Sequence, residues 1–295
     1  MTSTNSGSKF FAAFKKLLRR RWAGASVVLV LSLAAAIIAG VALVSDYAYY
    51  VDGTVKTVET VNMDTELGGF CGILCIILGI YDLFACSRYF KEIYKNRSCD
   101  YYFAAPIKRG EYFNSAFLFG ACVNAVAFLA GTALFTIILT CQTSIRARFT
   151  ISSSMGLNVL ALLLALLAAF AILLLCAVMA GKKLHYIVLA AISLISAPLA
   201  LTGVSSNINY IWGVIRANTG LASLSPIGNA INAYAYDYDS KIILLSIAVS
   251  VVEIIGAYVI GLLVFKRRKA EVAEVSLTGR IMPYVFLVLV QISTF

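Results

Sequence analysis

The chain has 295 residues, of which 61% are hydrophobic and 13% are charged. Soluble domains are about half apolar and about a quarter charged. Because only lipid can cover so much apolar surface, this composition excludes a soluble enzyme, an ordinary nucleic-acid-binding domain and a disordered chain. The sequence therefore predicts an all-α, polytopic membrane protein.

The first 22 residues combine aromatic and basic side chains at helical spacing. Apolar side chains recur from Phe10 to Leu18, and Trp22 follows. The basic residues among and after them are Lys15, Lys16, Arg19, Arg20 and Arg21. This pattern is typical of an amphipathic helix in the headgroup layer of an anionic membrane, with a tryptophan at the interface. We therefore expect residues 1–22 to form a cytoplasmic N-terminus that contains an interfacial elbow helix.

Six apolar runs follow, each long enough to cross a membrane. They comprise residues 23–44, 68–87, 112–141, 157–180, 186–203 and 242–265. About 20 helical residues cross a hydrocarbon core of about 30 Å. We therefore predict a six-span transmembrane domain from residue 23 to residue 265. The remaining residues, 266–295, are predicted to form a basic cytoplasmic segment and the start of a truncated seventh span. A fragment of a longer protein is the favoured interpretation, and a position of residues 281–295 at the membrane interface is the alternative.

The basic residues predict the orientation of these spans. With the N-terminus in the cytoplasm, nineteen of the 24 lysines and arginines fall in cytoplasmic segments. Such a bias is the positive-inside rule for a protein of the cell membrane. Topology thus accounts for the net charge of +10, and no nucleic-acid partner is required.

The sequence contains no motif for catalysis or metal binding. Neither a phosphate-binding loop nor an HExxH or GxSxG motif occurs, and the single histidine, His185, has no ligand partners at metal-binding spacing. The seven cysteines show no paired spacing and are interpreted as small hydrophobic residues. We therefore expect no catalytic residue, no metal and no directly bound cofactor.

Two acidic residues lie inside predicted spans. Asp82 is close to the cytoplasmic end of its span, and we expect a structural role, at the interface or in a pair with a basic residue there. Glu253 is in the middle of its span, with Ser250 nearest on the same face. A structural hydrogen bond and a place in a transport pathway are both open for Glu253. The same two alternatives are open for three asparagines in spans, Asn114, Asn124 and Asn158.

The segment between the second and third spans has a distinctive composition. Apolar spacing predicts that the second helix continues to about Arg97, and Ser98 is a candidate cap for a further short helix. The residues that define this short helix and its exit are Asp100, Tyr101, Tyr102, Phe103, Pro106, Lys108 and Arg109. The segment is interpreted either as a basic loop on lipid headgroups or as an aromatic helix that inserts into a groove of a cytoplasmic partner.

With these features in order, the chain resembles the permease subunit of exporter-type ATP-binding cassette (ABC) transporters. The resemblance covers residues 9–265 and rests on the elbow at 9–21, a coupling region at 98–106 and an outer segment at 204–241. It implies that the coupling region binds a separate ABC ATPase subunit, which binds and hydrolyses ATP. It also implies that a second permease subunit, identical or different, completes the pathway. The seventh apolar run departs from the six spans of the family.

Two other functions are compatible with the same residues. One is a polytopic scaffold or sensor component that recruits partners and transports nothing. The other is a secondary carrier that uses Glu253 as a proton site. The resemblance favours the permease, which is itself not an enzyme.

Overall fold

The structure is a computed structural model that describes residues 6–52, 61–94, 109–141, 149–150, 155–194 and 240–267. Within these residues, five helices are long and apolar enough to cross a membrane. The chain is therefore a membrane-embedded helical protein. Five of the predicted spans match these helices, whereas the predicted span at 186–203 is described only as the apolar helix Lys183–Leu194. The predicted run at 281–295 lies outside the described residues.

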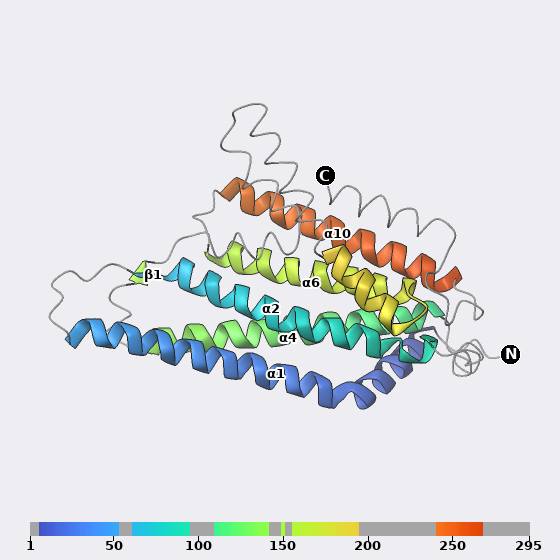
Figure 1. Cartoon of the computed structure of the whole chain (residues 1–295), viewed down its shortest axis with the longest axis horizontal. Coiled ribbons are helices and arrows are strands. Elements are labelled where there is room, and N and C mark those ends of the chain that lie inside the picture. The colour runs from blue at the N-terminus through green and yellow to red at the C-terminus, as the bar shows by residue number, and fades with distance from the viewer. Residues whose placement is uncertain are drawn as a thin grey trace, which may run out of the picture.

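The long helices lie side by side along the long axis of the molecule (Figure 1). Their bounds are α1 Ser6–Asp52, α2 Met63–Tyr89, α4 Arg109–Cys141, α6 Met155–Met179 and α10 Ser240–Arg267. A 3-10 helix, η1, spans Lys91–Tyr94. The strands β1 (Val61–Asn62) and β2 (Phe149–Thr150) are two residues long, so the described structure is helical apart from this pair.

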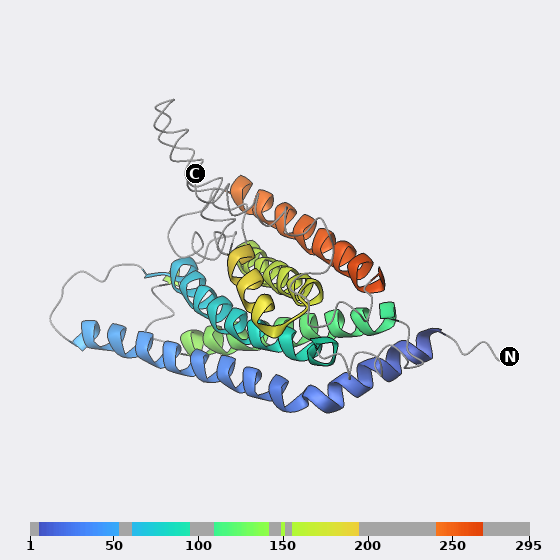
Figure 2. The same ribbon diagram turned by 45° about the vertical axis from the view of Figure 1, so that its right-hand side comes forward.

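Helix α1 is one continuous element where the sequence predicts two. Its 47 residues extend about 70 Å, more than twice the thickness of a hydrocarbon core. The predicted elbow is thus not a separate helix but the first turns of the helix that also forms the first span, and α1 bends in this N-terminal part (Figure 2). The reason is local: no glycine or proline occurs from residue 9 to residue 23 to interrupt good helix formers.

Contacts at the two ends fix the relative directions of the helices. Strand β1 directly precedes α2, and β2 ends five residues before the start of α6. The two strands pair in parallel with Val61 opposite Phe149, so these two helices start at the same end. At the other end, the side chain of Arg21 donates a hydrogen bond to the carbonyl of Arg88. There the Arg109 guanidinium also donates to the Lys266 carbonyl at 3.5 Å. We call this end, where α1 and α4 start and α2 and α10 end, the basic end.

The helix α2 ends earlier than the sequence predicts. Apolar spacing predicts a continuous helix to about Arg97, but α2 stops at Tyr89 and η1 follows. Tertiary contacts override the local pattern here, because Phe90 and Tyr94 turn inward and are buried in the bundle. Tyr94, the last described residue before the connection to α4, is therefore packed within the bundle and not at the tip of a protruding helix.

Two apolar clusters hold the bundle together. The cluster nearer the basic end is rich in aromatic side chains, with Phe119, Phe170 and Phe265 fully or almost fully buried. The second cluster contains the stacked rings of Phe70 and Phe135, whose centroids are 4.2 Å apart. Helices α2 and α6 contribute to both clusters and are the most buried of the spans, whereas α1 and α10 lie at the periphery.

The peripheral helices present apolar side chains outward. Ile38 of α1 is 70% exposed and Val252 of α10 is 69% exposed. Exposed aliphatic side chains on helices of this length are stable next to lipid but not next to water. A bilayer along the sides of the bundle accounts for these exposures.

Candidate functional site

Polar side chains within the bundle are the candidates for function, because each buried polar group in a membrane span needs a partner. On α10, a polar stripe combines Ser246, Ser250 and Glu253 on one helical face. Both serines are buried and Glu253 is partly buried, whereas the neighbouring Val251 and Val252 are exposed. The stripe thus lies on the side of α10 that faces the bundle, where α10 packs mainly against α6.

Two atoms of this stripe have no hydrogen-bond partner among the described residues. They are the buried Oγ of Ser250 and the buried Oε2 of Glu253. One turn further along, the Tyr258 hydroxyl donates to Oδ1 of Asn114 on α4 at 2.9 Å. Of the predicted pathway residues, Ser250 and Glu253 therefore share a face, and each has an atom without a partner in the described part of the chain, while Asn114 bonds a neighbouring helix.

Asp82 of α2 is the other intramembrane acid, and its environment differs from the expected one. Its side chain is only 1% exposed and reaches neither the interface nor a basic partner among the described residues. Instead, Nδ2 of Asn124 on α4 donates to both carboxylate oxygens, at 3.0 and 2.8 Å. Asp82 and Asn124 thus form a polar contact between α2 and α4 inside the bundle.

Tyrosine hydroxyl groups join helices near the basic end. Tyr112 donates to the Tyr89 carbonyl at 2.7 Å, and Tyr186 donates to the Leu83 carbonyl at 2.8 Å. The hydroxyl of Tyr94 donates to the carbonyl of Ala177 at 3.0 Å, in the last turn of α6. Carbonyls in the last turn of a helix lack intrahelical partners, so such a donor satisfies them.

The described residues that flank the predicted coupling segment consequently contact the ends of neighbouring helices. Tyr94, the last described residue before the segment, is bonded to α6. Arg109, the first described residue after it, contacts the C-terminal end of α10, where the Lys266 side chain also approaches Gly110. The predicted coupling residues themselves lie outside the described residues, except Arg109. They are Asp100, Tyr101, Tyr102, Phe103, Pro106 and Lys108.

The predicted elbow residues lie on the first turns of α1, where one face packs on the bundle. The ring of Phe14 meets Phe119 edge to face at 6.1 Å, and Leu17 is buried. Arg21 continues this face and caps the end of α2. The side chains of Lys15, Lys16, Arg19 and Arg20 are exposed.

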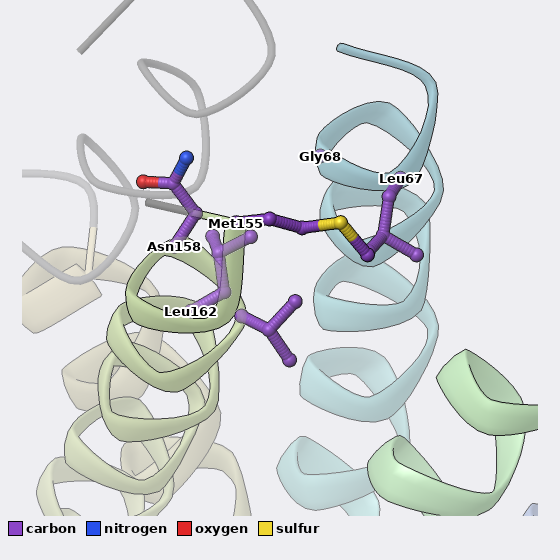
Figure 3. A pocket seen from close by; sticks show the side chains of 6 residues that line it. Leu67, Gly68, Met155, Asn158 and Leu162 are labelled. Atoms are coloured by element: carbon purple, nitrogen blue, oxygen red, sulfur yellow. The ribbon is translucent and has the colours of Figure 1, made fainter. Parts of the chain in front are cut away.

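A small pocket lies between α2 and α6 at the end opposite the basic end. Met155 reaches from α6 toward Leu67 of α2, while the amide of Asn158 points away from Leu67 (Figure 3). The pocket has a volume of about 10 Å³, roughly the space of one water molecule. The pocket is therefore too small for a transported molecule, and Asn158 does not contribute its amide to a pathway there.

Within the described residues, no group of three or more histidine, cysteine or acidic side chains is arranged to hold a metal. The sequence matches no known family model, and no significant match occurs among curated proteins.

Sequence reasoning missed the pairing of Asp82 with Asn124 and the tyrosine bonds. One signal for the pairing was present, because an asparagine and an aspartate in neighbouring apolar spans are each expensive without a partner. The rotation of each helix about its own axis decides which polar residues meet. The apolar runs in the sequence do not specify this rotation.

Proposed function

We propose that this chain is the permease subunit of an ATP-driven transporter of the ABC type, with the pathway in the membrane and ATP hydrolysis in a separate subunit. The proposal places the basic end in the cytoplasm and the bundle in the cell membrane. In this scheme the chain is not an enzyme and binds no nucleotide. A second permease subunit, identical or different, completes the pathway.

The anchoring of the coupling segment is the observation that carries the proposal. A segment that transmits force has to be tied to the elements that it moves. Here the segment between Tyr94 and Arg109 is tied to the end of α6 on one side and to the end of α10 on the other. Helix α10 carries Glu253 and Ser250, so a displacement of the segment acts on the helix with the candidate pathway residues.

The polar stripe of α10 supports the same proposal. A pathway needs polar groups inside the bundle that remain available to a passing molecule, and these two residues have such atoms within the described structure. The charge pattern supports the orientation, because cations at one end of a bundle mark its cytoplasmic side.

The experiment is purification of the tagged chain from its native membranes in mild detergent, followed by vanadate-sensitive ATP hydrolysis and identification of co-purifying subunits. The test variant replaces Tyr101, Tyr102 and Phe103 by alanine together. Each aromatic anchor at the centre of an interface contributes about 2 kcal/mol or more, so loss of all three removes the ATPase. The matched control replaces three aromatic residues of the predicted outer segment, Tyr234, Tyr236 and Tyr238, by alanine. This control variant is expected to retain the ATPase.

Either of two results overturns the proposal. One is a wild-type preparation without an ATPase subunit, which favours the scaffold. The other is a triple variant that retains the ATPase as well as the control does, which removes the coupling assignment.

The secondary carrier is a second candidate because one carboxyl oxygen of Glu253 has no partner among the described residues. A carrier takes up protons or cargo in response to a pH gradient in liposomes that contain this chain alone. Glu253→Gln removes that uptake. The permease shows no such uptake without its ATPase.

A further inference from the structure

Three basic residues lie on the elements that meet where α1 passes the end of α2. Arg21 lies on α1, Arg88 in the last turn of α2, and Lys91 at the start of η1. The hydrogen bond from Arg21 to the Arg88 carbonyl brings the first two elements together. Phe14 of α1 and Tyr89 of α2 both contact the ring of Phe119 on α4, and these contacts hold α1 next to the end of α2. We call Arg21, Arg88 and Lys91 the corner cations.

The corner cations have no anionic partner in the described structure. No carboxylate of the described side chains forms an ion pair with any of the three. The buried Nε of Arg21 also lacks a hydrogen-bond partner among the described residues. The carbonyl end of α2 offsets only part of this charge, because a helix end corresponds to roughly half an elementary charge. Among the described side chains, the positive charge of the corner is therefore not balanced by an acidic partner.

The position of the corner relative to the membrane indicates which kind of anion it binds. Arg21 directly precedes Trp22 and the uncharged run at 23–44, and Arg88 follows the apolar part of α2. The corner cations thus stand at the boundary between hydrocarbon and headgroups. The Trp22 side chain is 64% exposed and Leu18 lies one turn before it, on the outer side of α1. Indole and aliphatic groups beside cations fit the junction of a lipid headgroup with its acyl chains.

We infer that the corner cations form a binding site for the phosphodiester headgroup of an anionic phospholipid, with Trp22 against its upper acyl region. Arg88 and Lys91 are exposed and contact the phosphate, while Arg21 holds α1 on α2 and contributes charge. The site lies at the start of η1, next to the anchored coupling segment. A bound lipid therefore stabilises the corner on which that segment begins.

Trp22 supplies a local probe, since the chain has only two tryptophans. The experiment uses the full chain with Trp212→Phe in vesicles of phosphatidylcholine with a minor fraction of phosphatidylglycerol. Bromine atoms, which quench tryptophan, are placed on the acyl chains of one lipid or the other. Preferential binding makes brominated phosphatidylglycerol quench Trp22 more than its mole fraction predicts, and brominated phosphatidylcholine less.

The test variant is Arg88→Gln with Lys91→Gln, which leaves the Arg21 contact in place. Each basic residue near an anionic surface contributes about 1 kcal/mol, or about fivefold in affinity, so the preference falls by more than about tenfold. The matched control, Lys182→Gln with Lys183→Gln, removes two exposed cations of the same end and retains the preference. Thermal unfolding in detergent verifies that both variants fold.

Three outcomes contradict the inference. Quenching by each lipid in proportion to its mole fraction shows that no lipid is selected. An equal loss of preference in the test and control variants shows only a diffuse surface charge. Displacement of the lipid by millimolar-scale inorganic phosphate shows a site for soluble phosphate instead.

Discussion

The amide nitrogen of Asn124 lies 3.0 and 2.8 Å from the two carboxylate oxygens of Asp82, with both side chains buried between α2 and α4. The two residues are 42 positions apart in sequence. This contact joins the two spans that flank the coupling segment, so it holds together the framework on which that segment is mounted.

Loss of the Asn124 side chain is expected to destabilise the bundle. Asn124→Leu leaves the buried Asp82 carboxyl without its donor, which costs about 1–3 kcal/mol. Thermal or denaturant unfolding in detergent measures the change. Asn158→Leu, at an asparagine whose amide points away from the α2 contact, is the control and has a smaller effect. Equal effects of the two variants contradict the structural role of the Asp82–Asn124 contact.

Gly120 is predicted to tolerate no side chain. A Cβ at this position of α4 stands 2.2 Å from the Phe170 ring of α6, which is fully buried. Gly120→Ala is therefore expected to destabilise the protein by about 1–3 kcal/mol through overpacking. Gly79→Ala is the matched control, because nothing lies within 4 Å of its Cβ position. A stability of Gly120→Ala equal to that of the control shows that α4 and α6 do not pack as described.

Tyr94 is expected to transmit force from the coupling segment to α6. Tyr94→Phe removes only the hydroxyl bonded to the Ala177 carbonyl, at about 1 kcal/mol in stability. The co-purified ATPase is retained, but its rate of ATP hydrolysis changes. Tyr186→Phe removes a comparable bond at the same end, to the Leu83 carbonyl of α2, and leaves the rate unchanged because that bond does not join a residue next to the segment to α6. Identical rates in the wild type and Tyr94→Phe refute the transmission.

Ser250 and Glu253 are expected to be accessible to water in at least one state of the transporter. A hydrophilic thiol reagent should modify Ser250→Cys and Glu253→Cys faster than Val252→Cys, which faces outward into lipid. Mass spectrometry of peptides distinguishes these positions from the native cysteines. Equally slow modification of all three positions, with and without ATP, shows that Ser250 and Glu253 do not line a pathway.

The direction of the spans is open to labelling. Cysteine at Lys56 should react with a membrane-impermeant reagent in intact cells, and cysteine at Lys95 should react only after the membrane is opened. The nineteen-of-24 charge bias predicts this pattern. The structure supplies a second comparison, since Arg88 and Lys266 lie at the same end and cysteines there should behave alike. The reverse labelling pattern shows that the N-terminus lies outside the cell and that the predicted orientation of every span is wrong.

The sequence alone determined the protein class, the positions of five long helices and the segregation of charge to one end. These properties depend on local quantities: the length of an uncharged run relative to the bilayer, and the count of cations beside it. The sequence also placed Ser250 and Glu253 on one face of α10, because helical spacing follows from residue numbers.

Only the tertiary structure decided which faces meet. In lipid both the inner and outer faces of a span are apolar, so periodicity gives little information on the rotation of each helix. The burial of Asp82 against Asn124, the contact of Gly120 with Phe170 and the inward turn of Tyr94 all depend on that rotation. The same reason explains why α2 stops at Tyr89: the packing of Phe90 and Tyr94 in the bundle outweighs the local preference for a longer helix.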